Sequence, residues 1–189
     1  MGHYWKAFAT GIEYTLIITV CSVFFGFIIG ILLALARMAK GNPLKTAIRW
    51  LATAYVEFIR GTPMMVQVMF VYFGLGLFVN LPALTSGVIA ISLNSGAYVA
   101  EYIRGGINSV DVGQTEAARS LGMSNGETMR YVVLPQALKN IWPSLGNEFI
   151  TLIKDSSIVS IIGVTELIYQ SNIVRSDTYR GVAPIVVIM

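Results

Sequence analysis

The side chain with the clearest chemical potential in this chain is an acid inside an apolar stretch. Glu148 lies within the apolar segment 141–162, which also carries Lys154 and Asp155. A carboxylate inside a membrane costs free energy, so it normally faces a polar cavity or a charged partner. Its chemistry would therefore be the binding of a cation. Two sources of that cation remain open: the basic part of a ligand, or an internal partner such as Lys154 or Arg60.

The nucleophiles and metal ligands of the chain are too few for most catalytic classes. There is one histidine, His3, and one cysteine, Cys21. This excludes a histidine triad, a cysteine metal cluster and a disulfide within the chain, so no metal site is expected. The pattern G-x-x-x-x-G-K-[ST] does not occur, so the chain has no P-loop of its own. Ser156 near Lys154 is too slight a basis for an intramembrane enzyme.

The composition that surrounds these residues is that of a membrane protein. Hydrophobic residues make up 55% of the chain and charged residues 12%, and the mean hydropathy is +0.68. The net charge of +3 comes without a basic patch, which argues against nucleic acid as a partner. A hydrocarbon core of about 30 Å needs about 20 apolar residues in a helix. The long apolar runs therefore predict spanning helices in a lipid bilayer.

We expect an all-α membrane protein with about five transmembrane helices, the last of them incomplete. The second of these helices is expected to begin before residue 63 and to bend near Pro63. Residues 182–189 are too few to cross a bilayer, so the printed sequence is expected to stop within a fifth span. The expected spans are 11–36, 63–79, 83–103, 141–162 and the start of a fifth at 182–189.

Two details of these spans concern packing. Gly26 and Gly30 form a G-x-x-x-G pair in the first span, which favours close packing of two helices or, alternatively, a dimer face. The polar run 154–157 is expected to mark a helix break near an outer gate. Four further polar residues could line a pathway with Glu148 or bond helix to helix: Gln67, Asn94, Ser95 and Asn147.

Basic residues predict the orientation. Connections rich in lysine and arginine face the cytoplasm. Because spans alternate, the N-terminus, the turn near Asn80 and the segment 163–180 are expected outside. The two basic connections follow the first and third spans and hold Arg37, Lys40, Lys45 and Arg49, and Arg104, Arg119, Arg130 and Lys139, respectively.

The polar segment of about 104–140 has the pattern of two short helices at a tight corner. Residues 114–121 are predicted to form the first helix, and Gly122 is placed to adopt a left-handed conformation at its end. Small side chains on this helix would let another protein approach its backbone; the alternative is an ordinary surface helix that connects two spans. The face in question is predicted to hold Ala117, Ala118 and Leu121.

The second helix of this segment has a clear start. Ser124 and Glu127 stand at the spacing of a capping box. Pro135 is predicted to interrupt the helix after about three turns.

These residues resemble the cytoplasmic loop of bacterial ABC importer permeases, whose pattern is E-A-A, three residues, Gly, nine residues, Ile, one residue, Leu, Pro. Val132 stands in the Ile position. Other stretches resemble the polar amino-acid subfamily (histidine, arginine or glutamine type), namely 57–63, 97–101 with 104–106, and 154–157. The positions that match the loop pattern are Glu116, Ala117, Ala118, Gly122, Leu134 and Pro135.

The resemblance implies one permease domain over 1–189, with a cytoplasmic coupling segment, in the bacterial cytoplasmic membrane. It implies a second permease subunit, identical or related, and two cytoplasmic ATP-binding subunits that carry ATP and Mg. A solute-binding protein outside the membrane would deliver the substrate, and alternating access would move it. This chain would hydrolyse nothing and hold no cofactor. The implied docking surface for the ATPase is Glu116, Ala117, Ala118, Leu121 and Gly122.

The resemblance extends to permeases for basic amino acids around residues 146–149. A carboxylate at Glu148 would bind an ammonium or guanidinium group through charge-assisted hydrogen bonds. We therefore expect an importer for polar, basic amino acids. The alternative function is a self-sufficient secondary carrier or channel, although the chain has too few spans for the usual two-repeat carrier.

Overall fold

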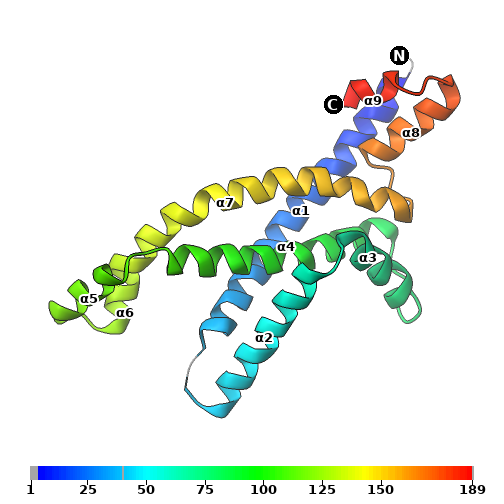
Figure 1. The fold of residues 1–189 in the computed structure, drawn as a ribbon. Coiled ribbons are helices and arrows are strands. Elements are labelled where there is room, and N and C mark those ends of the chain that lie inside the picture. Colours follow the sequence, from blue (N-terminus) through cyan, green and yellow to red (C-terminus); the bar gives the residue numbers. More distant parts are fainter. Residues whose placement is uncertain (1–3, 40, 189) are drawn as a thin grey trace.

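The computed structural model describes residues 4–39 and 41–188, and every regular element in these ranges is a helix (Figure 1). The expected all-α class is confirmed. Two short stretches, η2 and η3, have π-helical geometry, and η4 is a 3-10 helix. In chain order the elements are α1 (Trp5–Met38), α2 (Pro43–Gly61), α3 (Met64–Met69), η2 (Phe70–Gly74), α4 (Ala83–Asn108), α5 (Val112–Ser120), α6 (Asn125–Glu127), η3 (Thr128–Val133), α7 (Leu134–Asp155), η4 (Ser156–Ile162), α8 (Leu167–Thr178) and α9 (Ala183–Ile188).

Helices α1 and α4 pack closely together at the centre of the fold. A Cβ atom on Gly30 would lie 2.4 Å from Cγ1 of Val99, and one on Gly96 would lie 2.5 Å from Cγ2 of Ile29. No side chain fits at that separation, so glycine is what allows the two backbones to approach. The G-x-x-x-G pair therefore serves packing within the chain, as the first of the two alternatives predicts.

Fewer helices than expected are long and apolar enough to cross a membrane. By length and composition these are α1 and α4, with a third if 125–162 and α8, which meet at 57°, count as one span. The prediction of about five spans treats each apolar run as a helix of its own. In the structure, the run 63–79 holds only the short apolar helix Met64–Gly74, and the described part of 182–189 holds only α9.

The break between α2 and α3 has a local cause. Thr62 adopts extended backbone angles (φ −115°, ψ 144°), because the ring of Pro63 disfavours helical angles in the residue before it. A helix before residue 63 is present as predicted, but in place of a bend within one helix the chain breaks at Thr62 and Pro63 into α2 and α3.

The predicted interruption at Pro135 is wrong. The chain stays helical from Asn125 to Ile162, and Pro135 lies in the first turn of α7. The π-helical turn η3 precedes it, and such a wider turn shifts the hydrogen-bonding pattern where proline cannot donate. At the other end, α7 continues directly into the 3-10 helix η4 after Asp155. The predicted helix break within 154–157 is therefore a change of helix type, and the helix ends only at Gly163, which has φ +84°.

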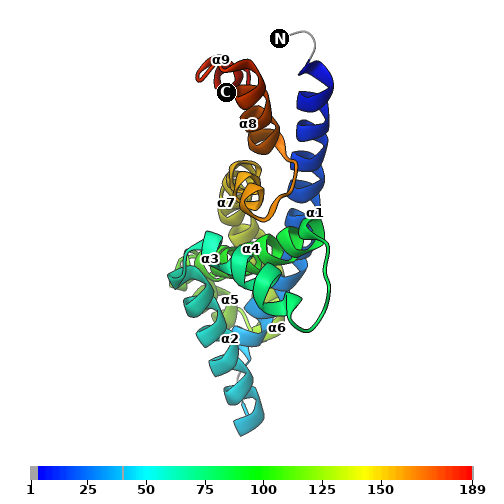
Figure 2. The same ribbon diagram turned by 90° about the vertical axis from the view of Figure 1, so that its right-hand side faces the viewer.

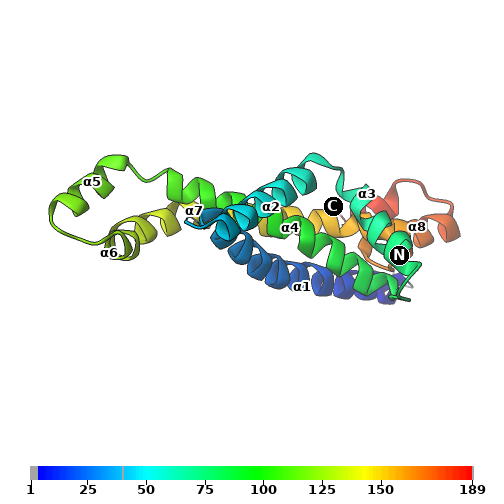
Figure 3. The ribbon, with the colours of Figure 1, turned by 90° about the horizontal axis from the view of Figure 1, so that it is seen from below.

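The segment with α5 and α6 projects from one end of the molecule. In Figures 1 and 3 it extends beyond the ends of α4 and α7, and α8 lies at the opposite end. Figure 2 shows α8 and α9 beside the N-terminal half of α1, and α1 packs on α8. Large apolar side chains on α1 are exposed, among them Leu16, Phe24 and Leu32, as expected of a helix that faces lipid.

Candidate functional site

The coupling segment, which we define as residues 104–140, contains a capped helix after the end of α4. Helix α5 starts at Val112, earlier than predicted, because the Asp111 side chain accepts a hydrogen bond from the backbone N–H of Gly113 at 2.6 Å. Aspartate is a preferred N-cap residue, and this signal could have placed the start correctly. At the other end, Gly122 has φ +85°, which confirms the predicted left-handed position.

A second set of contacts fixes the corner after α5. Oγ of Ser124 accepts from the backbone N–H of Glu127 at 3.3 Å, and the Glu127 carboxylate accepts from the backbone N–H of Ser124 at 2.8 Å. The predicted capping box is confirmed. The guanidinium of Arg119 also donates to the carbonyl of Met123. Side-chain contacts therefore hold this corner in one shape.

Most of the residues implied as a docking surface are exposed. Glu116, Ala117 and Gly122 are exposed, and Leu121 is 85% exposed. Ala118 is only 4% exposed, so the prediction that it shares an open face with Ala117 is wrong. Helix α5 packs on η3, and the side of α5 that faces η3 needs a small residue such as Ala118. The docking role itself stays a prediction.

A partly open cavity surrounds the acid in α7. The cavity has a volume of about 330 Å³ and lies between α4, α7 and the break before α3. We call it the Glu148 cavity. Glu148 is 7% exposed, and its Oε2 accepts a hydrogen bond from the Tyr102 hydroxyl at 3.0 Å. The residues that line the cavity are Thr62, Met64, Asn94, Tyr98, Tyr102, Glu148, Thr151 and Asp155.

The internal partners considered for Glu148 do not reach it. Nη1 of Arg60 lies 3.6 Å from Glu101 instead, and its Cζ lies 5.4 Å from the ring centroid of Tyr98. Lys154 is exposed. Within the described residues, no ion pair joins Glu148 to a basic side chain.

A second carboxylate lines the same cavity. Asp155 follows Glu148 by about two helical turns, so both side chains lie on one side of α7. The sequence pattern places Asp155 only in an expected helix break. The spacing of the two acids is the signal that could have grouped them. Two acids and no basic side chain among the lining residues favour a cationic ligand.

Gln67 lies outside the Glu148 cavity and holds one of its lining residues by a hydrogen bond. Its side-chain Nε2 donates to the carbonyls of Ile59 and Thr62 at 2.7 and 3.1 Å, where α2 ends before Pro63. Its Oε1 accepts from Nδ2 of Asn94 at 2.9 Å. Asn94 lines the Glu148 cavity and Gln67 does not. Gln67 therefore connects the helix break to the cavity.

The other two pathway candidates have different surroundings. Ser95 is 1% exposed; a Cβ atom on Gly26 would lie 2.9 Å from its Oγ, so it lies in the contact between α1 and α4, and its side chain also interacts with that of Glu148. Asn147 is exposed, and its carbonyl accepts from the Thr151 hydroxyl at 3.0 Å. Neither lines the Glu148 cavity.

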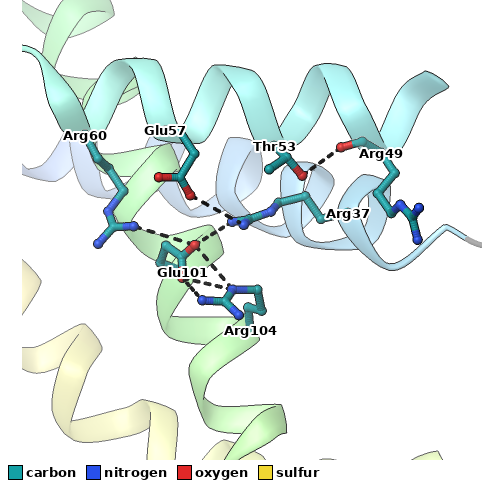
Figure 4. A network of polar contacts seen from close by, with 7 residues as sticks. All are labelled: Arg37, Arg49, Thr53, Glu57, Arg60, Glu101 and Arg104. Atoms are coloured by element: carbon teal, nitrogen blue, oxygen red, sulfur yellow. Dashed lines mark hydrogen bonds and ion pairs between the residues drawn. The ribbon is translucent and has the colours of Figure 1, made fainter. Parts of the chain in front are cut away.

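An ion cluster that no sequence pattern predicts joins three helices (Figure 4). Glu101 of α4 lies 2.7 Å from Arg37 of α1, 2.8 Å from Arg104 and 3.6 Å from Arg60 of α2. Arg37 also lies 3.9 Å from Glu57. The sequence places Arg37 in a connection, but it belongs to the last turn of α1.

Comparison with known proteins shows one family. The family model for the inner membrane component of binding-protein-dependent transport systems matches residues 26–189. A putative glutamine transport system permease protein of Rickettsia bellii is 43% identical over 175 residues, covering 92% of this chain and 78% of that protein. The arginine transport system permease protein of Bacillus subtilis is 42% identical over 179 residues, covering 94% and 80%.

Solved structures show the same fold. The crystal structure of an amino acid ABC transporter with histidines is 49% identical, with a TM-score of 0.92, and the match covers 100% of this chain and 86% of that one. A methionine ABC transporter in an inward-facing conformation is 22% identical, with a TM-score of 0.73, covering 88% and 79%. The second is a likeness of fold.

Proposed function

Because this chain belongs to the family of inner membrane components of binding-protein-dependent transport systems, we propose that its Glu148 cavity carries a basic amino acid across the membrane. The relatives are amino-acid permeases, and a solved amino acid ABC transporter shares the fold over the whole chain. The chain is thus a non-catalytic permease subunit of an amino-acid ABC transporter. The proposal concerns its substrate, its partners and its orientation.

The observation that carries the substrate class is the pair of acids in the cavity. Glu148 is buried and Asp155 is half-buried, and no basic side chain lines the cavity, so a ligand with two cationic groups would offset the cost of these two charges. Arginine and lysine each carry an α-ammonium group and a second cation on the side chain. The ring of Tyr98 and that of Tyr102 line the same cavity, and aromatic faces attract cations.

The exposed, capped corner of the coupling segment supports a docking role toward an ATPase. Glu116, Ala117, Leu121 and Gly122 would contact a cleft in a cytoplasmic subunit that binds ATP and Mg. A second permease and a second ATPase would complete the membrane complex, and an external binding protein would deliver substrate. In this arrangement, residues 104–140 face the cytoplasm of a bacterial cell and the N-terminus faces outward.

The experiment that tests this proposal is ATP hydrolysis by the complete complex reconstituted in liposomes with its binding protein. Arginine or lysine should stimulate hydrolysis more than glutamine, and uptake should stop when ATP is depleted. Glu148→Gln keeps the shape of the side chain and should abolish the stimulation. Glu13→Gln is the matched control, because Glu13 is an exposed acid of α1 outside the cavity.

Unchanged stimulation in Glu148→Gln would show that the acid does not bind the substrate. Uptake that continues without ATP would favour the secondary carrier.

A further inference from the structure

A second cavity lies in the groove between α4 and α7, next to the Glu148 cavity. Its volume is about 510 Å³, and its wall includes Gly105 of α4, Ser109 just after it, and Lys139 and Asn140 from the start of α7. The two cavities share one lining residue, Tyr102. The proposed function assigns this second cavity no role.

The order of the residues places the two cavities in series. Along α4, residues 94–102 line the first cavity and residues 101–109 line the second. Along α7 the order is reversed: residues 148–155 line the first cavity and residues 139–144 the second. Since α4 packs on α7, the two helices run in opposite directions along one groove. At about 1.5 Å per residue, the stretch from 94 to 109 is about 22 Å long, or most of a hydrocarbon core of about 30 Å.

Tyr102 stands where the cavities meet. Its hydroxyl donates to Oε2 of Glu148 at 3.0 Å, and the residue is part of both walls. A cation bound at Glu148 would share this carboxylate with the Tyr102 hydroxyl, because a carboxylate accepts several hydrogen bonds. Tyr102 would therefore lie directly beside the bound cation.

The far end of the second cavity lies at the base of the coupling segment. Ser109 follows the last residue of α4, and Nδ2 of Asn140 donates to its Oγ at 2.8 Å, which bridges the two helices. Pro143 cannot donate the helical hydrogen bond to the carbonyl of Lys139, so the wall offers polar backbone there. A polar solute could pass along such a wall without losing all its hydrogen bonds.

We propose that the second cavity is a release cavity, through which the substrate leaves the Glu148 cavity toward the coupling segment, and that Tyr102 separates the two. This proposal rests on the proposed function. It adds a route for release and names the residue that divides that route from the binding position.

The test attaches a bulky group to a cysteine in the release cavity, through a disulfide that a reducing agent can cleave. A Cβ atom on Gly105 meets no heavy atom within 4 Å, whereas one on the neighbouring Gly106 would lie 2.2 Å from Cγ1 of Ile141. Gly105→Cys is therefore compatible with the fold, and Cys21→Ser removes the one native thiol. The control is Gly76→Cys in the same background, since Gly76 is also exposed and open but lines neither cavity.

The complete complex is reconstituted in liposomes and treated with a bulky thiosulfonate reagent. In Gly105→Cys, modification should lower ATP-driven arginine uptake at least tenfold, leave arginine binding intact, and be reversed by dithiothreitol. The modified Gly76→Cys control should transport at its original rate. Because each protein is its own control before and after modification, a folding defect cannot imitate this result.

Two results would overturn the release cavity. One is full uptake by modified Gly105→Cys; the other is loss of arginine binding together with uptake, which would mean that Tyr102 does not divide the groove. If the unmodified protein takes up glutamine and no basic amino acid, the substrate proposal fails instead. The same modification experiment with glutamine then still tests the release cavity.

Discussion

The ion cluster around Glu101 should contribute more to the free energy of unfolding than ion pairs on the protein surface do. The side chains of Glu101 and Arg37 are 11% and 10% exposed, and their nearest atoms are 2.7 Å apart. Removing one partner of a buried ion pair costs about 3–5 kcal/mol, because the remaining charge stays buried without compensation. Glu101→Gln keeps the shape but removes the charge, so we expect a loss of about 3 kcal/mol in the free energy of unfolding.

Glu57 provides a matched comparison within the same cluster. It is 64% exposed and lies 3.9 Å from Arg37, and a surface ion pair contributes only about 0–1 kcal/mol. Glu57→Gln should therefore cost less than about 1 kcal/mol. Both variants can be measured by reversible unfolding of the purified protein in mixed micelles titrated with sodium dodecyl sulfate.

A third variant separates the charge from the packing. In Glu101→Leu with Arg37→Met, both charges are gone, so the double variant should lose less stability than the sum of the two single changes. Equal losses in Glu101→Gln and Glu57→Gln, or simple additivity in the double variant, would refute the claim that this cluster is a buried electrostatic unit.

Two further variants test packing and coupling. Gly30→Ala should lower the free energy of unfolding by about 1–3 kcal/mol, because its Cβ would lie 2.4 Å from Cγ1 of Val99; Gly146→Ala, where no heavy atom lies within 4 Å, should not, and a similar loss in both would speak against the packing argument. Ala117→Arg should abolish ATP-driven uptake while membrane insertion stays normal, since Ala117 is exposed. Normal uptake by this variant would rule out the docking role.

Features of the fold that depend on local chemistry could be predicted from the sequence. The left-handed Gly122 and the capping box at Ser124 each follow from the side chain or backbone of one or two residues, and the structure has both. The ring of Pro63 also acts locally, although it breaks the helix where a bend is predicted. The apolar runs predict helices in the same way. The number of spans is harder to predict, because the apolar run 63–79 forms only a short helix after the break at Pro63.

Features that depend on a neighbouring helix were predicted less well. Pro135 should end a helix by its own chemistry, yet the preceding π-helical turn lets the chain continue. Ala118 faces inward because η3 lies beside α5. The ion cluster at Glu101 joins residues from three helices that are distant in sequence. Of the pathway candidates, the structure brings only Glu148 and Asn94 into one cavity and adds Asp155 to them.

The central claim is that the Glu148 cavity binds a basic amino acid, and a structure of the complete complex solved in the presence of arginine tests it most directly. We predict one arginine in the Glu148 cavity of each copy of this chain in the complex. Its guanidinium or α-ammonium group should lie within hydrogen-bonding distance of Glu148 or Asp155. Arginine bound at another place while this cavity holds no ligand would contradict the account.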